Sequence, residues 1–108
     1  MFTVEQLKEA RERIADRKRW TRGAPARRRN GHPTHPLSTA AVKWCALGAL
    51  MRSGYPGWTD DDFDAYWAID KTVREGGGYS LTYLNDVDGH AAVLAVLDRA
   101  IALLETTE

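Results

Sequence analysis

The sequence has very little cysteine, no long apolar run and no overall excess of charge. Its single cysteine, Cys45, cannot form an internal disulfide, so nothing in the composition indicates an oxidising compartment. No run of about 18 apolar residues is present, which excludes a membrane-spanning helix. The N-terminus is charged and lacks the apolar segment of a secretory signal. We therefore expect a cytoplasmic protein with no membrane partner.

The bulk numbers indicate one globular domain. The chain has 108 residues, of which 44% are hydrophobic and 28% are charged, and these are ordinary values for a soluble protein with a single modest core. We expect residues 1–108 to fold as one domain.

The zero net charge conceals an uneven distribution of charge along the chain. Residues 1–36 carry ten Lys and Arg against four Asp and Glu, a net charge of +6. Residues 37–108 carry five against eleven, a net charge of −6. Such a split predicts either a basic arm for an acidic partner or two halves that pair when copies of the chain self-associate. Charge alone does not decide between these.

The first expected helix starts at a capping box. Thr3 and Gln6 are spaced so that each side chain can accept the backbone N–H of the other residue. Apolar residues follow at helical spacing, and we expect this helix to end near Trp20. Residues 21–36 have no periodicity and contain several glycine and proline breakers, which predicts a long basic loop. Loops of this length are usually functional or disordered.

A second helix is expected in the middle of the chain. Ser38 or Thr39 can cap it, and it would run to about Arg52, with Gly54 as its stop. Its apolar residues cover most of its circumference, which is typical of a helix in the centre of a core. Cys45 would then lie about two turns into this helix.

Two further helices complete the predicted fold. One is capped by Thr59 and ended by the glycines at 76–78, and the last runs from about Asp88 to Glu105. Residues 79–84 fit a helical turn or a short extended piece equally well. The sequence therefore predicts an all-α domain, a compact bundle of about four helices with a long basic loop after the first.

The segment from Asp86 to Gly89 resembles part of an EF-hand calcium loop. With Gly89 at the sixth position of the loop, Asp86 and Asp88 fall at the third and fifth positions, where oxygen ligands belong. Leu84 and Ala95 would then occupy the first and twelfth positions, and neither side chain can coordinate calcium. We therefore expect no calcium site.

Two histidines, His32 and His35, raise the question of zinc. Together with Cys45 they would supply three ligands, divided between a loop and a buried helix, which is a weak arrangement. We interpret both histidines as ordinary loop residues. No metal ion or other cofactor is expected.

A Cys–His pair is the one catalytic constellation that the sequence allows. It would use Cys45 as the nucleophile of a hydrolase or transferase, His90 as the base, and Asp86 or Asp88 to orient the histidine. The apolar neighbours of Cys45 predict burial, which raises the pKa of a thiol. A helix N-terminus also disfavours a protonated His90. A structural role for Cys45 is the favoured interpretation, and the catalytic role is the alternative.

The strongest candidate for partner binding is the basic segment between residues 18 and 29. Guanidinium groups pair with phosphates, and an interleaved aromatic residue such as Trp20 can stack on bases. The other interpretation is a solvated loop that balances the acidic remainder of the chain. No helix-turn-helix or zinc-finger signature accompanies the segment. The candidate partner-binding residues are Lys18, Arg19, Arg22, Arg27, Arg28 and Arg29.

Three segments resemble a family of small actinobacterial and phage proteins. They are WCALGAL at residues 44–50, NDVDGH at 85–90 followed by VLAVLDRAI at 93–101, and KRWTRG at 18–23. The family has no settled activity, so the resemblance implies a lineage rather than a mechanism. In the family, arginine often stands at the position of His90, which implies a polar anchor there rather than a general base.

A physical account of the two main segments is an internal packing site. Asn85, Asp86 and Asp88 can cap the last helix, and Gly89 permits a close approach of their loop to a neighbour. The small-residue face of the helix that holds Cys45 offers a place for that loop to dock. The expected structural motif comprises Trp44, Cys45, Gly48, Asn85, Asp86, Gly89 and His90.

Taken together, the sequence favours a small non-enzymatic protein that binds a macromolecular partner through its basic segment. The partner would be an acidic protein or a nucleic acid. The first alternative is the hydrolase or transferase built on Cys45 and His90. The second is a structural or assembly protein that forms homo-oligomers through its oppositely charged halves.

Overall fold

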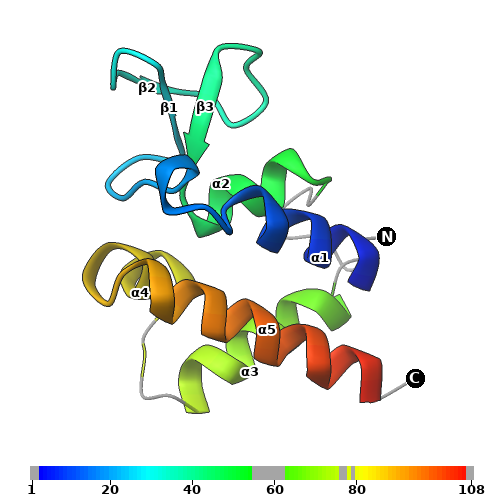
Figure 1. Cartoon of the computed structure of the whole chain (residues 1–108). Coiled ribbons are helices and arrows are strands. Elements are labelled where there is room, and N and C mark those ends of the chain that lie inside the picture. The colour runs from blue at the N-terminus through cyan, green and yellow to red at the C-terminus, as the bar shows by residue number, and fades with distance from the viewer. Residues whose placement is uncertain (1–2, 55–62, 76–77, 79, 107–108) are drawn as a thin grey trace.

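Helices form the larger part of the molecule, and a small sheet stands on one side of them (Figure 1). The structure is a computed structural model, and it describes residues 3–54, 63–75, 78 and 80–106. In chain order the elements are α1 (Val4–Arg13), the 3-10 helix η1 (Arg17–Arg19), β1 (Ala26–Arg28), β2 (Pro33–Thr34), β3 (Ala41–Trp44), α2 (Ala46–Arg52), α3 (Phe63–Glu75), α4 (Leu81–Val87) and α5 (His90–Thr106).

Helix α1 begins at the predicted capping box. The Thr3 hydroxyl accepts the backbone N–H of Gln6 at 3.2 Å, and the Gln6 side chain accepts that of Thr3 at 2.8 Å. The predicted end near Trp20 is wrong, because the α-helix stops at Arg13. The Asp16 carboxylate then accepts the backbone N–H of Lys18 and caps the short helix η1.

The prediction of an all-α fold is wrong, because three short strands form an antiparallel sheet in the order β2-β1-β3. Strands β1 and β2 lie inside the predicted basic loop, with Ala26 opposite Thr34. Strand β3 takes the place of the first half of the predicted second helix, with Trp44 opposite Ala26. Only three residues of the arginine-rich segment form β1, so its strand conformation depends on pairing with β3, which follows more than ten residues later.

Helix α2 therefore starts later than predicted, and Cys45 is its N-cap rather than a residue two turns inside it. Gly48 packs against the backbone of Pro25, and a side chain at position 48 would overlap the Pro25 carbonyl oxygen. The absence of a side chain at Gly48 therefore allows the segment that enters β1 to pack closely against α2. The predicted stop is confirmed: the helix ends at Arg52, and Gly54 follows with a φ of +110°.

The C-terminal half contains a short helix that the sequence left open. Residues 81–87 form α4, in which Asn85 and Asp86 lie in the last turn, and Asp88 is its C-cap. The expectation that these three residues cap the last helix is wrong. Gly89, with a φ of +95°, reverses the chain, and its carbonyl accepts the N–H of Val93 at the start of α5. The predicted last helix is confirmed as α5, whereas the predicted Thr59 cap lies outside the described residues.

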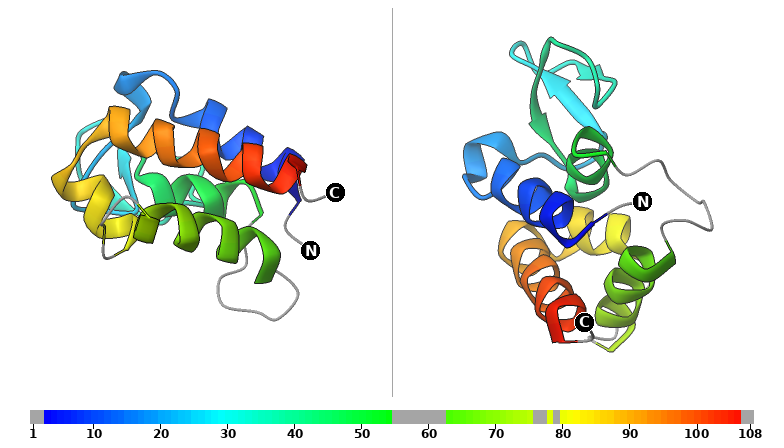
Figure 2. Two further views of the ribbon diagram at one scale, coloured as in Figure 1. Left: turned by 90° about the horizontal axis from the view of Figure 1, so that it is seen from below. Right: turned by 90° about the vertical axis from the view of Figure 1, so that its right-hand side faces the viewer.

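Helices α1 and α5 run side by side in opposite directions, so α1 begins where α5 ends (Figures 1 and 2). Helix α2 packs on the other side of α1, and α3 and α4 pack against α5. The core between them is apolar, and its largest fully buried aliphatic side chains are Leu7, Ile14, Leu50, Val73, Val93 and Leu97. Within the described ranges, no helix has the length and apolar character needed to cross a bilayer.

Candidate functional site

Asn85 is the centre of a buried hydrogen-bond network, which we call the Asn85 junction. Its side chain is fully buried, and its carbonyl oxygen accepts the indole N–H of Trp20 at 2.7 Å and the backbone N–H of Ala46 at 2.9 Å. Its amide group donates to the carbonyl of Thr21 at 3.1 Å. One side chain on α4 thereby holds the start of α2 and the chain that leads into the sheet.

Asp86 extends the junction to the basic segment. Its carboxylate accepts the backbone N–H of Gly23 at 3.1 Å and the side-chain amide of Asn85 at 3.0 Å. The Arg22 guanidinium donates to the Asp86 carbonyl at 3.2 Å and lies 5.0 Å from the centre of the Trp20 ring. Arg22 was predicted to bind a partner, but its guanidinium is engaged with the junction inside the fold.

Cys45 is held in the interior at the start of α2. Its backbone N–H donates to the Pro25 carbonyl at 3.1 Å, and its Sγ accepts the N–H of Gly48 at 3.3 Å. The residue is 6% exposed. Burial raises the pKa of the Cys45 thiol, and this effect exceeds the lowering by the hydrogen bond from Gly48. The environment therefore favours the thiol over the reactive thiolate.

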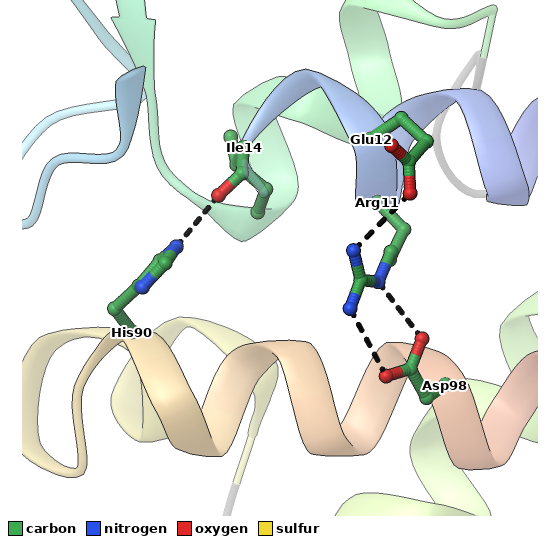
Figure 3. Close-up of polar contacts among 5 residues, drawn as sticks. All are labelled: Arg11, Glu12, Ile14, His90 and Asp98. Carbon is green, nitrogen blue, oxygen red and sulfur yellow. Dashed lines mark hydrogen bonds and ion pairs between the residues drawn. The ribbon is translucent and has the colours of Figure 1, made fainter. Parts of the chain in front are cut away.

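His90 is the first residue of α5, and it reaches across to the end of α1. Its Nε2 lies 2.6 Å from the carbonyl oxygen of Ile14, the C-cap of α1, and can donate to it (Figure 3). Its ring is 5.5 Å from that of Trp20. Among the described residues no hydrogen bond links His90 to Cys45 or to Asp86. The hydrogen bonds of the three candidate catalytic residues are made with other groups, and the nearby charge of Asp86 adds to the raised pKa of the Cys45 thiol instead of activating it.

Arg27 uses its guanidinium to brace the turn between β1 and β2. It donates to the Thr21 hydroxyl at 2.9 Å, to the Gly31 carbonyl at 2.9 Å and to the Arg22 carbonyl at 3.0 Å. The side chain is half-buried. Arg27 therefore resembles Arg22, another predicted partner-binding residue, in donating hydrogen bonds inside the fold, although the acceptors of Arg27 belong to its own segment and that of Arg22 belongs to α4.

The cations of α1 differ from those that follow it. In α1, Lys8 pairs with Glu105 at 3.1 Å and Arg11 with Asp98 at 2.9 Å, both on α5 (Figure 3 shows the second pair). Part of the +6/−6 division is thus neutralised within the molecule. Five cations between residues 17 and 29 are exposed, with no ion pair or side-chain hydrogen bond to any described residue, and we call them the free cations: Arg17, Lys18, Arg19, Arg28 and Arg29.

A groove lies between α1, η1 and β3, close to the free cations. It has a volume of about 600 Å³ and is open to solvent. Its lining residues are Glu9, Glu12, Arg13, Arg19, Ala41, Val42 and Trp44. The groove could not be predicted from the sequence because one wall belongs to β3, where the apolar pattern predicts a helix. The run Ala41-Val42-Lys43-Trp44, with a β-branched and an aromatic residue, was the available signal for a strand.

The two remaining histidines lie on the exposed surface of the sheet region. His35 Nδ1 accepts the backbone N–H of Leu37 at 3.1 Å, which stabilises the turn before β3. His32 follows the tight turn after β1. Over the described residues, no group of three His, Cys, Asp or Glu side chains is placed to hold a metal ion.

Comparison with known proteins gives a family but no described function. A model for DUF6197, a family of unknown function, matches residues 3–103. The chain therefore belongs to the DUF6197 family. No curated protein and no solved structure matches it significantly.

Proposed function

We propose that this DUF6197 protein is a non-enzymatic binding protein whose free cations contact an acidic partner protein. The observation that carries the proposal is the contrast between two sets of cations. Those of α1 are paired with carboxylates of α5 or of α1 itself, whereas Arg17, Lys18, Arg19, Arg28 and Arg29 face solvent and pair with no acidic side chain of the described residues. Unpaired cations close together raise the local concentration of an anionic partner and its association rate.

The burial of two tryptophans favours an acidic protein over a nucleic acid. Trp20 and Trp44, the aromatic residues beside the free cations, are only 7% and 8% exposed, and their indole N–H groups donate to Asn85 and to the Pro36 carbonyl. They offer no ring on which a base can stack.

The other two functions have less support. For an enzyme, Cys45 and His90 would have to leave their present hydrogen bonds and meet, and Cys45 is buried as a thiol. For self-association through opposite charges, part of the required charge is already engaged between α1 and α5.

The test compares two double variants. We expect wild-type protein to bind fluorescein-labelled poly-L-glutamate in low salt, and Arg28→Ala/Arg29→Ala to weaken this binding at least about fivefold. The matched control, Arg74→Ala/Arg99→Ala, removes the same charge from α3 and α5 and should change the affinity less than about twofold. Equal loss in both variants, or no binding by the wild type, would refute the proposal.

A random-sequence duplex DNA of matched charge serves as the competing partner. Preferential binding of the DNA, with a steep dependence on salt and the same sensitivity to Arg28 and Arg29, would indicate that the partner is a nucleic acid instead of an acidic protein.

From the resemblance of residues 18–23, 44–50 and 85–101, we also propose an actinobacterial or phage origin and a cytoplasmic site of action. The genes that neighbour this one test that origin.

A further inference from the structure

The bulge in β3 gives the groove beside α1 an apolar wall that a regular strand would not have. Arg27 is opposite Lys43 and Arg28 is opposite Ala41, so Val42 is an extra residue with no partner on β1. Neighbouring residues of a regular strand point to opposite faces, yet Ala41 and Val42 both line the groove. Bulges turn side chains in this way, and they are frequent beside binding sites.

This apolar wall is accessible. Val42 is 41% exposed, and Trp44, which is 8% exposed, also lines the groove. The Arg13 guanidinium lies over the Trp44 ring, 5.5 Å from its centre, and holds that ring in place. An apolar side chain of a ligand would find a preformed contact here.

The charges of the groove are unevenly compensated. Glu9 pairs with Arg13 at 2.6 Å, and Glu12 pairs with Arg11 at 3.1 Å. Arg19 lines the same groove and has no acidic partner among the described residues. Arg28 belongs to the same face, because it is in register with Ala41. The groove therefore presents an apolar wall next to uncompensated positive charge.

We infer that this groove receives a short segment of the acidic partner in which an apolar side chain stands next to carboxylates. The apolar side chain packs on Val42, beside Trp44, and the carboxylates pair with Arg19 and Arg28. The inference rests on the proposed function and adds the anchor that gives specificity. Charge alone attracts many anions, whereas an apolar contact selects among them.

The test uses two labelled peptides of equal charge, Glu-Glu-Leu-Glu-Glu and Glu-Glu-Ser-Glu-Glu, with the full chain. We expect the wild type to prefer the leucine peptide by roughly fivefold, the gain from burying part of one aliphatic side chain. Val42→Thr keeps the shape and the strand propensity of the side chain and should abolish the preference. Val87→Thr, at a residue that is 57% exposed on α4, is the matched control and should retain it.

Nuclear magnetic resonance locates the contact independently. The indole N–H signal of Trp44 should shift when the leucine peptide is added, and that of Trp20, buried in the Asn85 junction, should not. If the wild type binds both peptides equally, and Arg28→Ala/Arg29→Ala still abolishes binding, the groove does not bind an apolar side chain of the partner. The proposed function would then stand without it. Absence of binding to either peptide and to poly-L-glutamate would overturn both.

Discussion

The indole N–H of Trp20 donates to the side-chain carbonyl of Asn85 at 2.7 Å, and this bond joins residues 65 positions apart. The same oxygen accepts the N–H of Ala46, so one buried amide completes the entry of the sheet and the start of α2 together. A buried polar group that serves two donors is difficult to replace, because its loss leaves both donors without a partner.

Replacing Asn85 by alanine should lower the free energy of unfolding by about 3 kcal/mol, because the Trp20 indole and the Ala46 amide lose their acceptor in the interior. Urea denaturation followed by circular dichroism measures the loss. Asp88→Ala changes a neighbouring exposed residue and should cost less than about 0.5 kcal/mol. In a double-mutant cycle with Trp20→Phe, simple additivity would show that the indole–amide bond does not contribute.

Gly48→Ala should destabilise the protein by about 2 kcal/mol, although alanine is the better helix former. The added methyl group would overlap the carbonyl of Pro25, which is backbone and can move only by displacing the chain entering β1. Leu47→Ala, at the exposed neighbouring position of α2, is the control and should stay within about 0.5 kcal/mol of wild type. Equal midpoints for the two variants in thermal unfolding would contradict the close packing at Gly48.

The ion pair between Arg11 and Asp98 should contribute modestly to the docking of α1 on α5. Arg11 approaches Asp98 through two nitrogens, at 2.9 and 3.3 Å, but the two side chains remain 26% and 54% exposed (Figure 3). We expect a coupling energy of about 0.5–1 kcal/mol in a double-mutant cycle with alanine at both positions. The coupling should decrease in 1 M salt. A value that does not change with salt would point to packing instead of charge.

The contribution of Cys45 to the free energy of unfolding should decrease as the pH rises above neutral. Burial raises the pKa of its thiol in the folded chain, so the stabilising contribution is complete below the pKa of the unfolded thiol. It is lost as the pH rises through the folded value, because the unfolded chain then gains more from ionisation. The difference in unfolding free energy between wild type and Cys45→Ala should therefore shrink between neutral and strongly alkaline pH. Urea titrations across that range measure it.

The same burial predicts low thiol reactivity. At a mildly alkaline pH, Cys45 should react with a disulfide reagent at least about tenfold more slowly in the native protein than in urea. A native rate equal to or above the unfolded rate would revive the enzyme built on Cys45 and His90.

The sequence predicted the elements whose signals are local. The Thr3–Gln6 capping box, the stop at Gly54 and the long apolar helix α5 each depend on residues within a few positions of one another. The sheet was missed because its strands are two to four residues long and are stabilised by partners far away in the sequence. Arg27 was predicted to bind a partner, and only the folded turn reveals three acceptors around its guanidinium.

The candidate site also has one part that the local sequence predicts and another that depends on contacts between distant residues. The position of the basic segment could be predicted from composition, and the structure adds which cations are exposed. Which of them are engaged inside the fold could not be predicted, because the acceptor of the Arg22 guanidinium is the Asp86 carbonyl of α4, more than 60 residues later in the sequence. The groove could not be predicted either, because its apolar wall depends on the bulge at Val42. A one-residue irregularity of that kind has no clear signature in the sequence.

The position of Asn85 also sets the order in which the chain can fold. Trp20 and the first turn of α2 are completed by a residue of the C-terminal half, so the N-terminal half cannot close its own interior while it emerges from the ribosome. Contacts across such sequence separations slow folding, because the chain must lose loop entropy before it gains them. A nascent chain that ends before α4 would leave the Trp20 indole and the first turn of α2 without the acceptor that completes them.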